Sequence, residues 1–450
     1  MLNQKNQLKF FCAIIMAMVM VGLPTYCQSE DLLSCVLLAQ KSDPQLLKAK
    51  DILEAAHAGK DITRSILFPH LVANASVSLN KIHLKGFGPK IDDTFLSDSY
   101  SVILSQSILN GPAWSQIKVA NKELRKSIAA VEATEQDLIM RVVYAYFNLL
   151  KANIALEAAL SEQNLLQETY ERAEYMLETG NGDIVSLHEA KARLDNSKAK
   201  IIELKNKVQI AKKNLNRVVH ANVGPVKDVN ENLAPLPPSP NNLQEWIDSA
   251  LKTQPILIEA KAGFESAQKQ LEQAKRARWP RVELFAGRNY IKGRLMPRLH
   301  SGEWLAGLKV DFPVFLGGQI GAKQQKARAL SLAARHELAK REDQIILATE
   351  TAFLNLKNSI ALVQASKTAL ESAKIALSAT KEGLEAGTRN TVDLLEQITR
   401  LENSRRQYVY ALYHHLISRF ELKFACGALN IQDVASINTL LTDSITYHDN

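Results

Sequence analysis

The stretch "LEAGTRNTVDLLEQ" at residues 384–397 joins two strongly helical segments through Gly387. A near-copy, "LETGNGDIVSLHEA", occupies residues 177–190 and turns at Gly180, so the two stretches lie 207 residues apart. Two copies of one helix–turn–helix stretch indicate an internal repeat, and such a repeat has to be traced before local structure is assigned.

The repeat extends well beyond these two turns. "SDPQLLKAK", which starts at residue 42, corresponds to "TQPILIEAK", which starts at residue 253, at an offset of 211 residues. The offset then falls to 207, as in "RLDNS" at 193–197 and "RLENS" at 400–404. We therefore predict two halves that share one architecture and are joined by a Pro-rich connector.

The repeat divides the chain into five segments. A signal peptide is expected at 1–27, a first repeat at 28–219, a connector at 220–242, a second repeat at 243–427 and a C-terminal tail at 428–450. In each half the expected order is a short helix, two β-strands, a very long helix, a turn and a second helix.

The long helix of the second half has the clearest pattern. Residues 319–386 contain no proline. A heptad seam runs through Leu356, Val363, Leu370, Leu377 and Leu384, with the small residues Ser359, Ser366, Ala373 and Thr380 three positions later. About 67 residues at 1.5 Å each give a helix about 100 Å long, the reach of a rod that crosses the periplasm. An ordinary soluble coiled coil fits this evidence equally well.

The expected strands favour a membrane protein. "HLVANASVSLN" at 70–80 alternates apolar with polar residues, and so do "DSYSVILSQS" at 98–107 and the stretch from Glu303 to Phe312. Strands of about ten residues with one apolar face are typical of outer-membrane barrels. Tyr100 and Trp304 stand on the apolar face, where aromatic belts form at membrane interfaces.

Four strands cannot close a barrel in lipid, because the smallest outer-membrane barrels need about eight. Two copies would give eight strands, and three copies would give twelve strands and a lumen. Polar faces made mostly of Ser, Asn and Gly favour the open lumen. The predicted fold class is mainly α with a β-barrel portion built by an oligomer.

The N-terminus reads as a secretory signal. Lys5 and Lys9 precede the apolar run "FFCAIIMAMVMVGL", which is too short for a membrane helix. Cys27 could carry a lipid anchor, although "PTY" before it lacks the usual lipoprotein pattern. Along the remaining chain, lysines and acids are interleaved, which indicates a solvated helical surface and no nucleic-acid partner.

No catalytic constellation stands out, so we expect neither an enzyme nor a bound cofactor. His414 and His415 have no spaced ligand partners, and we interpret them as surface histidines and not as a metal site. Cys35 and Cys426 lie near the two ends of the mature chain. They could pair in an oxidising periplasm or remain isolated buried thiols.

The chain resembles the TolC family of outer-membrane efflux and export ducts over almost its whole mature length. The motifs that carry the resemblance are "SDPQL" and "TQPIL", "DFPVFLGGQIGAKQQKA" (311–327), "LEAGTRNTVDLLEQITRLENSRRQYVYALYHHLI" (384–417) and "ACGALNIQDV" (425–434). The resemblance implies a homotrimer with a twelve-stranded β-barrel in outer-membrane lipid and a twelve-helix α-barrel in the periplasm. A mixed belt would surround its middle.

The resemblance also implies the function and the partners. Such a duct conducts drugs or proteins passively, in a tripartite efflux pump or a type I secretion system. Its partners are a periplasmic adaptor and an inner-membrane pump of the RND, ABC or MFS type. By matching position, Gly180 and Gly387 fall on turns that contact the adaptor.

The same resemblance assigns residues to the tunnel entrance. Asp393 and Glu396 fall on two acids whose threefold repetition forms carboxylate rings at the aperture, and residues three apart share a helix face. Arg389 matches an arginine that holds the tip closed, but its two partner positions are here Leu384 and Ser186. Asp183 and Glu189 are alternative partners for this arginine.

Two other classes of protein stay in view. A periplasmic adaptor would normally have one helical hairpin between β-rich lobes, whereas this chain predicts two equivalent hairpins. A structural coiled-coil protein would not need paired alternating strands.

Overall fold

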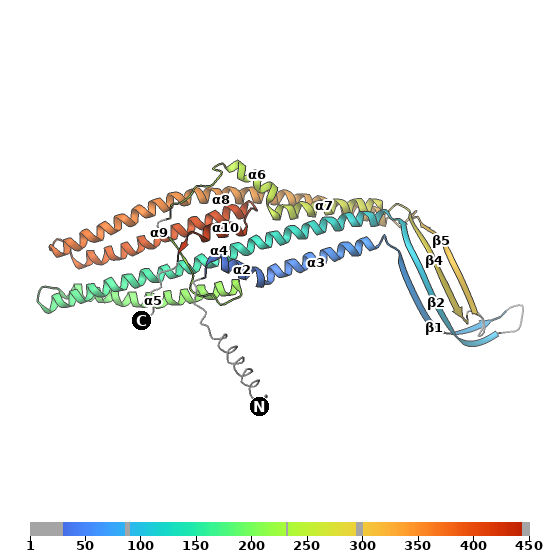
Figure 1. The fold of residues 1–450 in the computed structure, drawn as a ribbon, viewed down its shortest axis with the longest axis horizontal. Coiled ribbons are helices and arrows are strands. Elements are labelled where there is room, and N and C mark those ends of the chain that lie inside the picture. The colour runs from blue at the N-terminus through green and yellow to red at the C-terminus, as the bar shows by residue number, and fades with distance from the viewer. Residues whose placement is uncertain (1–29, 86–90, 231–232, 294–299, 443–450) are drawn as a thin grey trace, which may run out of the picture.

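The computed structural model describes residues 30–85, 91–230, 233–293 and 300–442. It has a long helical body with a β-sheet at one end (Figure 1). The expected signal peptide at 1–27, with Cys27, and the end of the C-terminal tail lie outside the described residues.

The two halves contain the same elements in the same order. The first half comprises α2 (Leu32–Ser42), α3 (Pro44–Ser65), β1 (His70–Leu84), β2 (Ile91–Leu109), α4 (Gly111–Glu178) and α5 (Ile184–Val219). The second half comprises α6 (Leu243–Thr253), α7 (Pro255–Arg276), β4 (Arg281–Lys292), β5 (His300–Asp311), α8 (Gln319–Glu385) and α9 (Thr391–Ala425). The prediction of two structural repeats around very long helices is confirmed.

Each half differs from the prediction in having two short helices in place of one. The first pair is separated at Asp43, whose backbone is extended and whose side chain accepts a hydrogen bond from the Leu46 N–H. Pro44 follows directly, and proline suits the first turn of a helix but cannot continue the preceding one. The second pair is separated at Gln254 before Pro255. The Gln254 backbone is also extended, but its side chain does not cap α7 and donates instead to the Phe424 and Ala425 carbonyls.

The four long strands form one antiparallel sheet in the order β1-β2-β4-β5. The register places apolar residues of neighbouring strands on one face, as in the row Leu71, Leu104, Ala286 and Ala306. The opposite face mixes Ser, Asn and Gly with larger apolar and charged residues, and Glu283 lies beside Lys309 near the helices. The strands contain 12 to 19 residues, so they are longer than the ten residues expected.

The outer edges of the sheet are β1 and β5, which run in opposite directions. If β5 of one copy lies beside β1 of the next, the antiparallel pattern continues around a ring, and three copies give twelve strands. An open edge cannot stay unpaired in lipid. The sheet of one chain can therefore continue into copies on both sides, and it would be a third of the twelve-stranded barrel that the resemblance implies.

The helices form a wall in which α4 packs between α3 and α7 and also contacts α5 and α9, while α8 packs on α7 and α9. The predicted heptad seam of α8 is buried at Leu356, Val363 and Leu370. A second heptad position on α8 leaves Leu347, Leu354 and Ile375 exposed. Apolar residues on the outermost helices indicate faces that neighbouring copies cover.

The largest hydrophobic cluster lies at mid-length, where α2, α4, α5, α9 and α10 (Ile431–Asn438) meet. The connector crosses this region. Its strand β3 (Asp228–Val229) pairs with β6 (Leu441–Thr442) of the tail, and the Tyr146 hydroxyl donates to the Lys227 carbonyl. Connector and tail therefore form a mixed α/β layer on the helices.

The interpretation of both histidines as surface residues is wrong for His415, which is 1% exposed. Its Nε2 accepts a hydrogen bond from the Leu236 N–H of the connector, and its Nδ1 lies 2.8 Å from the Ser359 hydroxyl. Burial, with the charges of Arg419 and His414, lowers the pKa of His415 to about 4. The ring is therefore neutral at pH 7 and fastens the connector to α8 and α9.

Cys35 and Cys426 are free and fully buried. They belong to different hydrophobic clusters, so the interpretation as isolated thiols holds. Burial raises the pKa of Cys35 to about 12 and that of Cys426 to about 11, which keeps both thiols protonated. None of the described helices has the length and apolar character required to cross a membrane.

Candidate functional site: the two hairpin tips

Both helical hairpins end at the side of the molecule opposite the sheet (Figure 1). Gly180 and Gly387 have positive φ angles of 77° and 72°, the left-handed conformation that glycine adopts without steric cost. In the first turn the N–H of Asn181 donates to the Met176 carbonyl, and in the second turn the N–H of Thr388 donates to the Gly383 carbonyl. Both tips are therefore the same Schellman turn, which satisfies the last carbonyls of the long helices.

The helices that follow the two turns, α5 and α9, both begin with an acidic cap, but the acid is the N-cap residue in α5 and lies three residues after the N-cap in α9. In the first tip, Asp183 is the N-cap and accepts hydrogen bonds from the Ser186 N–H and hydroxyl. In the second tip, Asn390 is the N-cap and Asp393 completes a capping box with it. Asp393 and Ser186 occupy equivalent positions, so each tip holds one carboxylate where the helix dipole favours it.

Arg389 lies over the second turn, and its Nη1 is 4.0 Å from the Asp393 carboxylate. A Cβ atom on Gly383 would come within 2.8 Å of the Arg389 side chain, so the glycine makes room for it. The two alternative acids have partners within the first hairpin. Asp183 caps α5, and Glu189 lies 3.6 Å from Arg193.

Glu396 is exposed and lies three residues after Asp393, on the same face of α9. Leu384 packs with Leu377, Leu394 and Ile398 in a cluster between α8 and α9. Leu384, which stands at one of the two partner positions of the matched arginine, therefore packs inside the hairpin.

The two hairpins are joined directly above the tips by Leu395, which is fully buried. It comes from α9 and packs against Leu166 of α4 and against Ala190 and Leu194 of α5. This contact was missed by the sequence reasoning, although "DLLEQ" places two leucines between the two acids.

Polar contacts continue the junction between the hairpins higher up. The Thr399 hydroxyl of α9 donates across the interface to the Glu162 carboxylate of α4 at 3.1 Å. Lys200 of α5 donates to the same carboxylate at 2.9 Å from within the first hairpin. The Ser161 hydroxyl donates to Glu402, and burial raises the pKa of Glu402 against the opposing effects of Ser161 and Arg405. The hairpins are therefore linked by several groups that bind across the interface.

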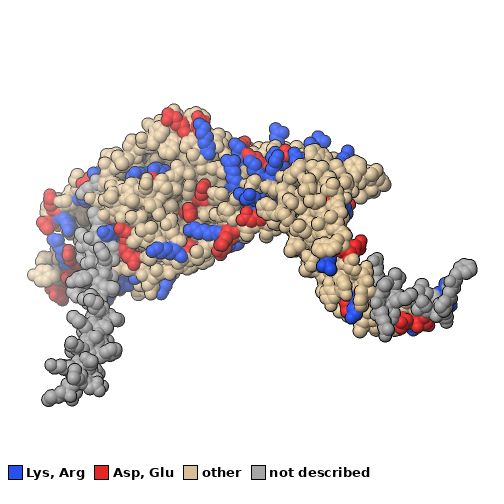
Figure 2. All heavy atoms as spheres, turned by 45° about the vertical axis from the view of Figure 1, so that its right-hand side comes forward, with Lys and Arg blue, Asp and Glu red and all other residues tan. Residues whose placement is uncertain are grey.

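The surfaces of the two tips differ. The first tip exposes the apolar side chains of Tyr175, Ile184 and Val185. The second tip exposes charged side chains, including Lys381, Glu385 and Arg389. Over the long helices, basic and acidic residues are interleaved (Figure 2), in agreement with the sequence.

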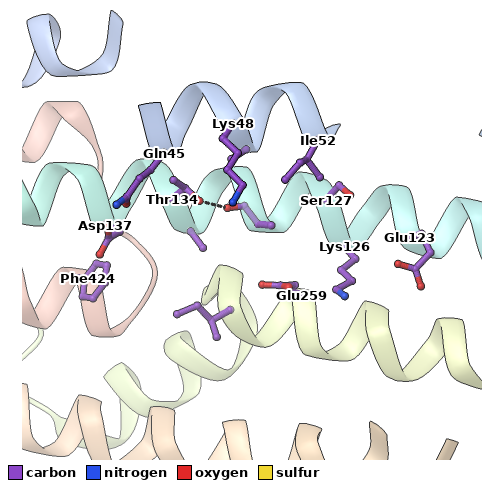
Figure 3. A pocket seen from close by; sticks show the side chains of 14 residues that line it. Gln45, Lys48, Ile52, Glu123, Lys126, Ser127, Thr134, Asp137, Glu259 and Phe424 are labelled. Carbon is purple, nitrogen blue, oxygen red and sulfur yellow. Dashed lines mark hydrogen bonds between the residues drawn. The ribbon is translucent and has the colours of Figure 1, made fainter. Parts of the chain in front are cut away.

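A separate hollow of about 860 Å³ lies across α4, between α3 and α7 (Figure 3). Its charged side chains, among them Lys48, Lys126, Glu123 and Glu259, come from three helices. Among the described residues of the chain, no group of three His, Cys, Asp or Glu is placed to hold a metal ion.

Comparisons with known proteins agree with this geometry. The family described as "Outer membrane efflux protein" matches residues 36–219 and 246–428, one match for each repeat. The chain is 24% identical to "Outer membrane protein TolC" of Escherichia coli K12, over 98% of this chain and 90% of the relative. It is 24% identical to "Alkaline protease secretion protein AprF" of Pseudomonas aeruginosa, over 88% of this chain and 84% of the relative.

A solved structure of CusC, described in terms of folding and transmembrane channel formation, has the same fold. Its TM-score is 0.78 at 19% identity, with 88% of this chain and 92% of that chain covered. The family match covers both repeats and leaves out the connector, as expected if each repeat is one copy of the family's structural unit. The chain belongs to the outer membrane efflux protein family.

Proposed function

We propose that three copies of this chain form a continuous duct from the periplasm to the cell exterior. The chain is an outer-membrane channel protein that extends into the periplasm, and it serves efflux or type I secretion. The observation that carries the oligomeric barrel is the matching set of open edges, and the number of three copies is the one that the resemblance to the TolC family implies. One chain supplies four antiparallel strands with unpaired edges at β1 and β5, and a helical wall with exposed apolar residues on α8.

The segments then have separate roles. After removal of the signal peptide at 1–27, the repeats at 28–219 and 243–427 remain. Each repeat supplies two of the twelve strands of the β-barrel in the trimer. The connector at 220–242 and the tail at 428–450 form a belt around the helices. The pairing of β3 with β6 and the bond from Leu236 to His415 support this role.

The hairpin tips form the periplasmic entrance of the duct. Three copies of Asp393 and Glu396 place carboxylates around the aperture, and rings of carboxylates favour cations over anions in a pore. The capping box supports this assignment because it fixes the Asp393 side chain at the start of α9.

Arg389 contributes to the closed state through the acid that it faces. Within one chain this acid is Asp393, so the arginine offsets part of the charge of the ring that it borders. Ser186 and Leu384 then act by supporting their own hairpins, through the α5 cap and the Leu377 cluster. Arg389→Ser should raise the single-channel conductance, and an unchanged conductance would count against this role.

The partners are a periplasmic adaptor at the turns of Gly180 and Gly387, and behind it an inner-membrane pump of the RND, ABC or MFS type. The exposed Tyr175, Ile184 and Val185 support the adaptor contact, because large apolar groups at a polar tip mark interaction surfaces. AprF is named for the secretion of a protease, and this relationship supports a secretion partner as one alternative.

Cell fractionation and a deletion strain test this function together. The protein should be recovered as a trimer in the outer membrane, and the deletion strain should lose resistance to dyes and detergents or lose a secreted protein. Recovery in the soluble periplasm, as expected for an adaptor or a structural coiled coil, would overturn the proposal.

A further inference from the structure

The apolar face of the sheet carries a charged side chain among its apolar rows, that of Arg288 in β4. The register places it in a row with Ala73, Val102 and Trp304, all of which lie on the face that contacts lipid. A charged side chain on the lipid face of a barrel is unfavourable near the bilayer midplane and tolerated near the headgroups.

The height of Arg288 places it in the outer half of the apolar band, from which its long side chain can extend toward the outer headgroups. It lies seven residues beyond Arg281, at the base of β4, which is about 23 Å along the strand at about 3.3 Å per residue. With a strand tilt near 40°, the rise is about 18 Å within an apolar band about 25 Å tall. Tyr100 and Tyr290 form the next row outward, with ring centroids 6.4 Å apart, as in an aromatic girdle.

The Arg288 guanidinium lies 5.1 Å from the Trp304 ring centroid, and this stacking fixes its direction. Lys292 and His300 face each other two rows farther out on the same side. The one acid opposite them in the described register is Asp98 of β2, which pairs with Lys292. Within these three rows of the apolar face, the described residues of β2, β4 and β5 therefore include two permanent cations, Arg288 and Lys292, one histidine and one carboxylate, that of Asp98.

Two hollows on the same face meet at Arg288. One has a volume of about 550 Å³ and includes Leu71, Leu104, Ala286 and Ala306 among its lining residues. The other has a volume of about 330 Å³ and is lined in part by Ala73, Ala75 and Tyr100. Arg288 lines both, so apolar grooves lie on both sides of one cation.

We infer that Arg288, with Lys292 and Trp304, binds a phosphate of the lipid A headgroup in the outer leaflet, with acyl chains in the two hollows. Guanidinium groups suit phosphate because they present parallel N–H donors. The position in the outer part of the sheet selects the outer leaflet over the phospholipids of the periplasmic leaflet. The inference rests on the membrane barrel proposed above.

The test measures binding of bisphosphorylated lipid A to the purified full-length trimer in neutral detergent, with dephosphorylated lipid A and phosphatidylglycerol as the other probes. Arg288→Leu should lower lipid A affinity at least tenfold, and Arg288→Lys should lower it less. Lys309→Gln is the matched control, because it removes one cation from the opposite face of the sheet. Arg288→Gln replaces the leucine variant if that variant does not form trimers.

The outcomes separate the inference from the function. Equal lipid A affinity of wild type and Arg288→Leu, or equal affinity for lipid A with and without phosphates, would overturn the inference. Equal or tighter binding of phosphatidylglycerol would also overturn it, because the site would then select a phospholipid. Conductance of the same wild-type trimers in bilayers tests the channel independently.

Discussion

Leu395 gives the sharpest prediction about gating. If the entrance opens by separation of the two hairpins of each chain, the contact of Leu395 with Leu166, Ala190 and Leu194 exists only in the closed state. Leu395→Ala should therefore favour the open state. Leucine-to-alanine changes in cores cost about 2–5 kcal/mol, and the small surrounding cluster suggests about 3 kcal/mol here.

A trimer contains the substitution three times, so concerted opening would be favoured by roughly 9 kcal/mol. About 5.5 kcal/mol is enough to move a two-state equilibrium from 1:99 to 99:1. Planar-bilayer recordings should show channels that are mostly open, and cells should become sensitive to large antibiotics. Leu204→Ala is the matched control, because Leu204 packs with Ala155, Ala159 and Ile201 inside the first hairpin.

The mechanism fails if folded Leu395→Ala trimers conduct like Leu204→Ala trimers. In that case the Leu395 contact would persist in the open state, and the movement would have to lie between chains. Heat-stable trimers on gels provide the check on folding for both variants.

Three further predictions concern stability and reactivity. Asp43→Ala should lower the free energy of unfolding by about 2–4 kcal/mol, because it removes the α3 cap and one of the two carboxylates that bind Arg141, the one at 2.9 Å, while Asp137 remains at 2.8 Å. Asp51→Ala, at an exposed site, should change the free energy of unfolding little, and thermal unfolding measures both variants. The pKa of His415 is lowered to about 4, so the stability that it contributes above pH 6.5 is lost as the pH falls toward 4, by about 2 kcal/mol between pH 7 and pH 5. His415→Gln should weaken this pH dependence of the melting temperature, whereas a profile unchanged from wild type would contradict it. Cys35 and Cys426, both buried, should react with a thiol reagent only at the rate of unfolding, and fast labelling of the native trimer would show that a thiol is accessible.

The repeat made most of the helical fold predictable. Offsets of 211 and 207 residues place α6 and α7 on α2 and α3, and α9 on α5, because the helix-starting prolines Pro44 and Pro255 and the turn glycines Gly180 and Gly387 recur at the same places in each half. The length of α8 follows from the absence of proline and from its heptad seam. The break at Asp43 was predictable in principle from Asp-Pro, which disfavours a continuous helix.

Other features depend on contacts between distant segments. His415 looks like a surface residue beside His414, and only the arrival of Leu236 from the connector makes it a buried acceptor. The capping role of Asp393, by contrast, is a local feature. It follows from Asn390 three residues before it, so it was predictable from the sequence. Arg288 interrupts the apolar–polar alternation of β4, so the sequence alone does not show which face it occupies. Its place on the apolar face became clear from the register, which pairs it with Val102 of β2.

The central claim is that three chains form a duct whose entrance is lined by Asp393 and Glu396. Reversal potentials of purified trimers in planar bilayers under a salt gradient test it most directly. The wild type should conduct with cation selectivity, and Asp393→Asn combined with Glu396→Gln should move the reversal potential toward zero while the trimers stay intact. Absence of conductance by wild-type trimers, or identical reversal potentials for wild type and the double variant, would contradict the account.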